Sequence, residues 1–366
     1  MKILYVTTVA ITMNFFTNFI DRLVKEGNTV EIVSNCDDYE LNEIYNELGC
    51  KVHNIPFSRS PLSLSNIKAY KMLKKVVNAG NYDIVHCHTP IAAAATRLAC
   101  KKARKKGTKV FYTAHGFHFY KGAPFKMKLM FYPVEKICSK YTDTLITINK
   151  EDYELAQKKF KAKRVAYVPG VGIDVEMFKY ALADKPLMCG EIGIPQDVKI
   201  LLSVGETNAN KNHSTVIKAL PLVDDKNLHY VIAGDGLLKE QLNEIAVKYG
   251  VGDRVHPLGK RSDVALLYNL ANFYIHPSFR EGLPVAVMEA MASGLPIACS
   301  KIRGNVDLID EAGGVLFSPY SVEECAGAIN LLLESDIEAI GNYNMQKAEQ
   351  FSVEKINEEM LSLYNS

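Results

Sequence analysis

Short runs of β-branched and other apolar residues alternate with amphipathic stretches along most of the chain. Five runs in the first half are expected to be buried strands, at 2–8, 29–34, 83–88, 109–115 and 144–149. Five in the second half repeat the rhythm, at 199–205, 229–236, 254–260, 272–278 and 296–300. Helical stretches include 66–79, 91–106, 211–220, 238–249 and 284–292. Apolar strands that alternate with helices are typical of parallel sheets covered by helices on both faces.

The alternation predicts an α/β protein with two Rossmann-like, doubly wound parallel sheets that face each other across a cleft. Turn residues without a clear period at 168–180 mark the boundary, so we expect domains at 1–170 and 171–349. The chain reads as helical after Ser335, and residues 350–366 are expected to pack back on the first domain. Ligands of such sheets bind beyond the carboxyl ends of the strands, which places the site in the cleft.

The composition is that of an ordinary globular protein, with 48% hydrophobic and 23% charged residues among 366. This excludes collagen-like and largely disordered classes. The eight cysteines form no CxxC pair and are expected to be reduced, as in a cytoplasmic protein. Residues 3–20 carry no charge, but a strand at 2–7 and a helix from about Met13 explain them better than a signal peptide or membrane span.

The net charge of +2 hides a division between the two halves. Residues 1–178 hold 27 Lys and Arg against 16 Asp and Glu, whereas 179–366 hold 16 against 25. The excess peaks at 101–140, with eleven cations and one acid. A basic half fits anionic lipid, phosphorylated substrates or nucleic acid, but no nucleic-acid recognition motif is present. The segment 117–136 interleaves aromatic residues with lysines, which fits either a peripheral surface on the cytoplasmic face of the membrane or a helix packed into the core.

The segment 276–300 carries the most informative chemistry. Pro284 suits the first position of a helix, which places Glu281 in the preceding loop and Glu289 inside the helix. The N–H groups at the start of a helix lack intrahelical acceptors and favour an anion such as a diphosphate. A capped amphipathic helix with two solvated glutamates explains the pattern equally well when it is taken alone.

This segment, Glu281-Gly282-Leu283-Pro284 with Glu289, resembles the motif of retaining glycosyltransferase family 4, whose members have two Rossmann domains of the B type. Other stretches match in order and spacing, so that the resemblance covers nearly the whole chain: 203–213, 233–236, 258–264 and 114–122. The last resembles a histidine-containing loop of bacterial capsule and exopolysaccharide enzymes.

The resemblance implies that the first domain binds the acceptor and the second the nucleotide-sugar donor. It implies that a diphosphate binds Lys211 and the N–H groups at 282, 283 and 285. Glu281 would then bind sugar hydroxyls, and Glu289 would bind a ribose. The donor-binding residues that it implies are Gly205, Glu206, Arg261, Gly282, Leu283, Pro284, Val285 and Glu289.

Two departures from the family pattern matter. Family members often have arginine where this chain has Glu206, so Lys211 is expected to carry more of the diphosphate charge, helped by Arg280 or Arg261. Arg261 fits a contact with the nucleobase and an exposed surface position equally well. Many members also have a glycine-rich loop after the first strand, where this chain reads TTVAITMNFF. Asn14 in that stretch is a candidate acceptor contact.

Histidines of the first half are further candidates. His115 follows an apolar strand and precedes a glycine, and the resemblance places it on the donor sugar near the anomeric carbon; a core histidine is the alternative. His118 is a candidate for acceptor binding. His86 and His88 are expected to be structural, because no suitably spaced carboxylate completes a metal site. The chain contains no Asp-x-Asp motif, so we expect no metal and no other cofactor.

These observations predict a metal-independent retaining glycosyltransferase in surface polysaccharide synthesis, with Lys211, Glu281 and His115 as catalytic residues. The predicted donor is a UDP-sugar, with a UDP-N-acetylhexosamine as one candidate, and the acceptor is a glycan or lipid-linked sugar. The alternatives are a sugar-nucleotide epimerase on the same fold and a non-catalytic sugar-nucleotide-binding subunit. A nicotinamide dehydrogenase is disfavoured, because no GxGxxG follows the first strand.

Overall fold

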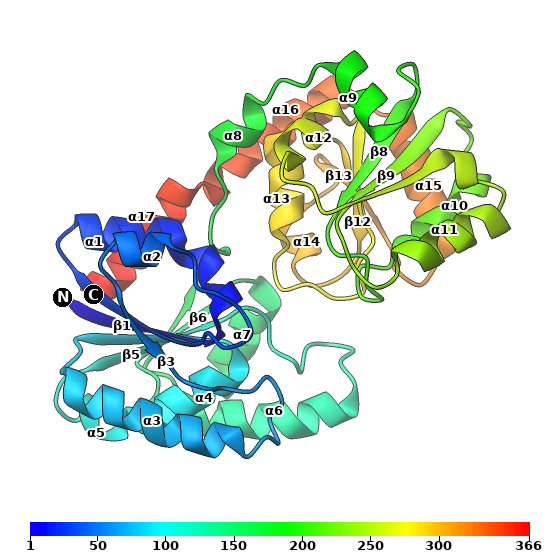
Figure 1. Ribbon diagram of the computed structural model, residues 1–366. Coiled ribbons are helices and arrows are strands. Elements are labelled where there is room, and N and C mark those ends of the chain that lie inside the picture. Colours follow the sequence, from blue (N-terminus) through cyan, green and yellow to red (C-terminus); the bar gives the residue numbers. More distant parts are fainter. The chain divides into compact units, whose positions relative to one another are not determined.

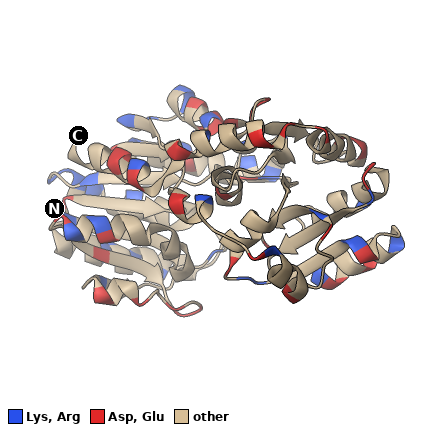
Figure 2. Ribbon diagram, turned by 90° about the horizontal axis from the view of Figure 1, so that it is seen from above, with Lys and Arg blue, Asp and Glu red and all other residues tan.

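The computed structural model describes residues 1–366, which form two compact units. The first unit consists of Met1–Val171 and Val353–Ser366, and the second of Gly172–Ser352 (Figure 1). The basic excess belongs to the first unit, which holds 28 Lys and Arg against 17 Asp and Glu. Figure 2 shows positive and negative residues interspersed along the chain. The basic excess therefore means that the first unit has more cations than anions in total.

A seven-stranded parallel sheet in the order β3-β2-β1-β4-β5-β6-β7 forms the centre of the first unit. Its strands are β1 Lys2–Val9, β2 Thr29–Asn35, β3 Lys51–Asn54, β4 Ile84–His88, β5 Lys109–Ala114, β6 Thr144–Thr147 and β7 Arg164–Tyr167. The inner strands are buried on both faces, which explains their continuous apolar runs.

Helices cover both faces of this sheet. They are α1 Thr17–Lys25, α2 Ile44–Glu47, α3 Ser65–Gly80, α4 Pro90–Ala99, α5 Lys101–Arg104, α6 Phe125–Cys138, α7 Lys150–Lys159 and α17 Val353–Asn365, with 3-10 turns at Ala10–Phe16 and Ser139–Tyr141. One core lies between the sheet and α3 and α4, and the other between the sheet and α1 and α17 (Figure 1). The C-terminal helix thus returns to the first unit, as expected.

The second unit contains a six-stranded parallel sheet in the order β10-β9-β8-β11-β12-β13. Its strands are β8 Lys199–Val204, β9 Leu228–Ala233, β10 Val255–Gly259, β11 Phe273–His276, β12 Ile297–Ser300 and β13 Gly314–Phe317. Its helices are α8 Val175–Lys179, α9 Lys185–Ile192, α10 His213–Ala219, α11 Lys239–Lys248, α12 Val264–Leu270, α13 Val285–Ala292, α14 Asn305–Leu308, α15 Val322–Leu333 and α16 Ile337–Ala348, with 3-10 turns at Leu220–Leu222, Gly252–Arg254 and Glu349–Phe351. Helices α10, α11 and α15 pack around one core, while α13 contacts α8, α12 and α16.

Both doubly wound sheets confirm the predicted fold class, with differences in detail. The strands β3, β7 and β13 were not expected; all three are four-residue edge strands, and partial exposure leaves them without a long apolar run. The helix expected from Met13 begins at Thr17, because residues 10–16 form a 3-10 turn. None of the helices combines the length and the apolar character that a membrane span requires.

Candidate active site

The order of the strands in the second unit brings two loops together. From β8 the sheet grows through β9 and β10 on one side and through β11, β12 and β13 on the other. The loops that follow β8 and β11 therefore leave the same edge of the sheet in opposite directions, and ligands of open α/β sheets bind at such a point. Lys211 lies in the first of these loops and Glu281 in the second.

Lys211 and Glu281 form an ion pair across this point. The ammonium nitrogen Nζ lies 2.8 Å from Oε1 of the carboxylate, and the two side chains are 21% and 15% exposed. Burial alone would raise the pKa of Glu281, but hydrogen bonds from His276 and Lys211 and the charge of Lys211 hold it well below its usual range. Glu281 is thus a charged acceptor at neutral pH, beside a cation that solvent can still reach.

Glycines let the backbone approach closely beside this pair. Gly205 follows β8 with a φ of +149°, and a Cβ there would lie 3.1 Å from Cε of Lys211. A Cβ on Gly234, after β9, would overlap the carbonyl oxygen of Gly205 at 1.9 Å. A side chain at either position would displace the lysine stem or the loop, so these glycines fix where the ammonium lies.

Helix α13 places the second glutamate. The helix begins at Val285 with Pro284 as its N-cap, one residue later than expected. Glu289 lies one turn inside, where Tyr268 donates a hydrogen bond to its Oε2 at 3.0 Å. Burial raises the pKa of Glu289, so the two glutamates differ: Glu281 is held as the anion, and Glu289 is nearer to its neutral form.

The other predicted donor residues have local partners. Arg261 donates two hydrogen bonds to the carboxylate of Asp263, which holds its guanidinium within its own loop. Glu206 accepts a hydrogen bond from Asn208 at 2.8 Å. The structure therefore brings Lys211 and Glu281 together directly, while Arg261 and Glu206 bond to neighbours in their own loops.

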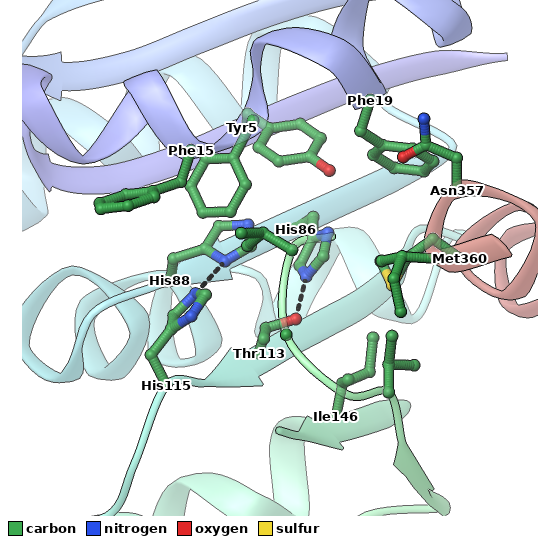
Figure 3. A pocket seen from close by; sticks show the side chains of 15 residues that line it. Tyr5, Phe15, Phe19, His86, His88, Thr113, His115, Ile146, Asn357 and Met360 are labelled. Atoms are coloured by element: carbon green, nitrogen blue, oxygen red, sulfur yellow. Dashed lines mark hydrogen bonds between the residues drawn. The ribbon is translucent and has the colours of Figure 1, made fainter. Parts of the chain in front are cut away.

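Three histidines of the first unit line a small apolar hollow at the carboxyl ends of β4 and β5 (Figure 3). Nδ1 of His88 lies 3.1 Å from Nε2 of His115, and His86 lies between the hydroxyls of Thr113 and Tyr364. Burial lowers the pKa of His115 to about 4 and that of His86 to about 3, so both are neutral at pH 7. Nε2 of His88 has no hydrogen-bond partner and is buried in this hollow.

The predicted acceptor residues lie in two different loops of the first unit, which follow β1 and β5. The ring of His118 stacks on Phe131 of α6 with 4.4 Å between centroids. Asn14 is exposed on the 3-10 turn at residues 10–16. No group of three or more His, Cys, Asp or Glu side chains is arranged to hold a metal ion.

Comparison with known proteins assigns the family. Residues 184–350 match the model of glycosyl transferases group 1, and residues 2–149 match the glycosyl transferase 4-like model. A Bacillus subtilis protein named as the glycosyltransferase EpsD is 38% identical over 320 residues, which are 86% of this chain and 84% of that protein. The chain is a member of the family 4-like glycosyltransferases. The resemblance read from the motifs is therefore confirmed.

Other relatives of this glycosyltransferase carry more specific names. An Escherichia coli protein, 30% identical over 72% of this chain and 69% of its own length, is named UDP-Gal:alpha-D-GlcNAc-diphosphoundecaprenol alpha-1,3-galactosyltransferase. Among solved structures, Anabaena HepE in complex with UDP superposes with a TM-score of 0.82 at 20% identity, with both chains fully covered. That likeness confirms the fold.

The glycosyltransferase also contains site residues that the sequence analysis missed. His276, at the end of β11, is 2% exposed and bonds Glu281, and Tyr274 lies behind it. Arg303 donates a hydrogen bond to the backbone oxygen of Glu281 at 3.2 Å. The apolar run at 272–278 was the only signal for the histidine, because His276 follows its last apolar residue.

The segment 117–136 is partly buried in the core and partly exposed. Phe117 and Phe119 are buried and stacked in the core of the first unit. On α6, by contrast, Phe125 and Leu129 are 75% and 66% exposed. The aromatic residues at its start therefore pack inside, while the helix presents an apolar surface among lysines.

Proposed function

We propose that this glycosyltransferase is a retaining hexosyltransferase that moves a sugar from a UDP-sugar to a glycan or lipid-linked acceptor in surface polysaccharide synthesis. The observation that carries the proposal is the Lys211–Glu281 pair at the point where the second sheet reverses direction. The cation of Lys211 suits the diphosphate of a nucleotide sugar, and the carboxylate of Glu281 can accept hydrogen bonds from the hydroxyls of its sugar. Relatives named for UDP-galactose and for diphosphoundecaprenol-linked acceptors support the substrate classes.

The chemistry follows from the flow of charge. Breaking the bond between the anomeric carbon and UDP builds negative charge on the diphosphate and positive charge on the sugar ring. Lys211 and the backbone N–H groups of Gly282, Leu283 and Val285 stabilise the leaving diphosphate as its charge develops. The charge of Lys211 and the dipoles of these N–H groups take the role that a divalent metal has in other transferases, so we propose transfer without a metal.

Glu281 is proposed to bind hydroxyls of the sugar. Two donors hold its Oε1, which leaves Oε2 to accept from the donor sugar. These donors also lower its basicity, which supports hydroxyl binding over covalent attack on the anomeric carbon. The leaving phosphate then helps to remove the acceptor proton, and attack occurs on the face that UDP leaves. Glu289 is proposed to accept from the ribose, and Arg261 to contact the nucleobase.

The first unit is proposed to supply the acceptor side. His115 is neutral at pH 7 and is tied to His88, so it can offer a hydrogen bond to the sugar near the anomeric carbon without adding charge. His118 and Asn14 are proposed to contact the acceptor.

The test is a screen of nucleotide sugars by thermal stabilisation, followed by transfer assays with lipid-linked acceptors. We expect stabilisation by UDP and one UDP-sugar, with an unchanged anomeric configuration in the product by proton NMR. Glu281→Ala should damage turnover and leave UDP affinity nearly intact. Release of a new sugar nucleotide without any acceptor would support the epimerase, and binding without turnover would support the non-catalytic subunit.

We further propose that α6 docks the enzyme on an anionic membrane surface. Its exposed residues Phe125, Leu129 and Ile137 can enter the interface while Lys126 and Lys128 face lipid head groups. This surface would bring the acceptor side to a lipid-linked substrate.

Liposome flotation tests this docking with two matched variants. Replacing Lys126 and Lys128 by serine should weaken binding to anionic vesicles at low salt, because each cation near such a surface contributes about 1 kcal/mol. Replacing the exposed Lys25 and Lys51, of α1 and β3, should leave it unchanged. Equal binding by both variants would contradict the proposal.

A further inference from the structure

His276 lies directly beneath the carboxylate of Glu281. His276 is the last residue of β11 and is 2% exposed. Nε2 of its ring lies 3.1 Å from Oε1 of Glu281. On its other side, Nδ1 lies 3.2 Å from the hydroxyl of Tyr274, which is fully buried. Lys211 approaches the same carboxylate oxygen from the more open side.

The partners of His276 determine which of its nitrogens carries the hydrogen. An ionised carboxylate can only accept, so Nε2 must donate to Glu281. Burial lowers the pKa of His276, which leaves the ring neutral, and Nδ1 then accepts from the hydroxyl of Tyr274. The hydroxyl of Ser278 lies 3.2 Å from Nε2 and is a second neighbour of the same donor.

The two donors to Glu281 differ in their freedom to move. Lys211 has a flexible four-carbon stem and is drawn toward any diphosphate that enters the site. His276 is held in a buried strand, with its backbone oxygen accepting from the hydroxyl of Ser300. Its hydrogen bond to Glu281 therefore persists while the lysine turns to the phosphates.

We propose that His276 is a positioning residue, which holds the Glu281 carboxylate against the donor sugar when Lys211 engages the diphosphate. This inference rests on the proposed function. His276 touches no substrate group itself; it fixes which oxygen of Glu281 faces the sugar. A displacement of about 1 Å at such a group is enough to cost ~100-fold in rate.

Two substitutions separate positioning from packing. In His276→Gln the side-chain amide reaches the position of Nε2 and can still donate to Glu281, whereas in His276→Asn it reaches only the position of Nδ1. We expect His276→Asn to lower kcat about 10- to 100-fold and His276→Gln to recover most of that loss. The Kd for UDP alone should change less than threefold in both, because UDP carries no sugar for Glu281 to bind. Equal losses in both variants, or a parallel loss of UDP affinity, would show a structural role and overturn the proposal.

A double-mutant cycle tests whether His276 acts through Glu281. In a Glu281→Gln background, His276→Asn should add less than a twofold further loss. If the two substitutions instead lower kcat independently, so that their separate fold-losses multiply in the double variant, the proposal is overturned. If Glu281→Gln itself transfers sugar at the normal rate, the role proposed for Glu281 fails. If Glu281→Gln is damaged while His276→Asn is not, only the positioning role fails.

Discussion

Removal of the Lys211 ammonium is the most direct test of the donor site. Lys211→Met keeps the aliphatic stem that lies against Gly205 and deletes only the charge. Two unit charges about 4 Å apart interact by about 4 kcal/mol at the effective dielectric of a protein surface, and part of this is offset by desolvation. Loss of one preorganised donor to a developing anion costs about 100- to 1000-fold in kcat, or about 2.7–4 kcal/mol. We therefore expect kcat/KM to fall by at least ~100-fold.

The assay is steady-state release of UDP with the donor sugar that the screen identifies. The lysine faces a charge that grows during reaction, so kcat should fall more than UDP affinity does. Lys248→Met removes an exposed cation of α11 in the same unit and should leave transfer unchanged. Turnover of Lys211→Met within threefold of the unmodified enzyme would refute the electrostatic role.

Two further predictions concern stability. Arg97→Met deprives buried Glu135 of two of its three hydrogen bonds and of its counter-charge, and leaves only the bond from Tyr112. This should cost about 3–5 kcal/mol, measured by hydrogen exchange of the α4 amides. A second change, Glu135→Met, should restore most of that loss, and no recovery would contradict the pairing. Although burial raises the pKa of Asp143, Arg104 and Lys163 lower it to about 2. Asp143→Asn should therefore lower the free energy of unfolding by about 1 to 2 kcal/mol above about pH 4, and this difference from the unmodified protein should vanish as the pH falls toward 2. A cost that does not depend on pH would refute the role of this ion pair.

Much of the fold could be predicted from the sequence, because inner strands of a parallel sheet are buried on both faces and form unbroken apolar runs. The edge strand β3 could not, since its residues are half exposed and resemble a loop. The 3-10 turn at residues 10–16 carries the same apolar spacing as a helix, and only the structure distinguishes them.

The sequence motifs identified individual residues of the site but not the contacts between them. Lys211 and Glu281 were each expected near a diphosphate, but they are 70 positions apart, and only the strand order shows that they meet. The bond between His276 and Glu281 depends on where β11 ends and how the next loop folds back. No periodicity encodes such a contact.

The discontinuity of the first unit has a consequence for synthesis on the ribosome. Residues 172–352 are contiguous and can complete their own core as soon as they emerge. The earlier 171 residues supply one core by themselves, but the other must wait for α17, whose Tyr364 hydroxyl bonds His86 at 2.6 Å and whose buried side chains complete it. The nascent chain thus holds an unfinished N-terminal half through most of translation, and this is the interval in which a chaperone would find exposed apolar surface.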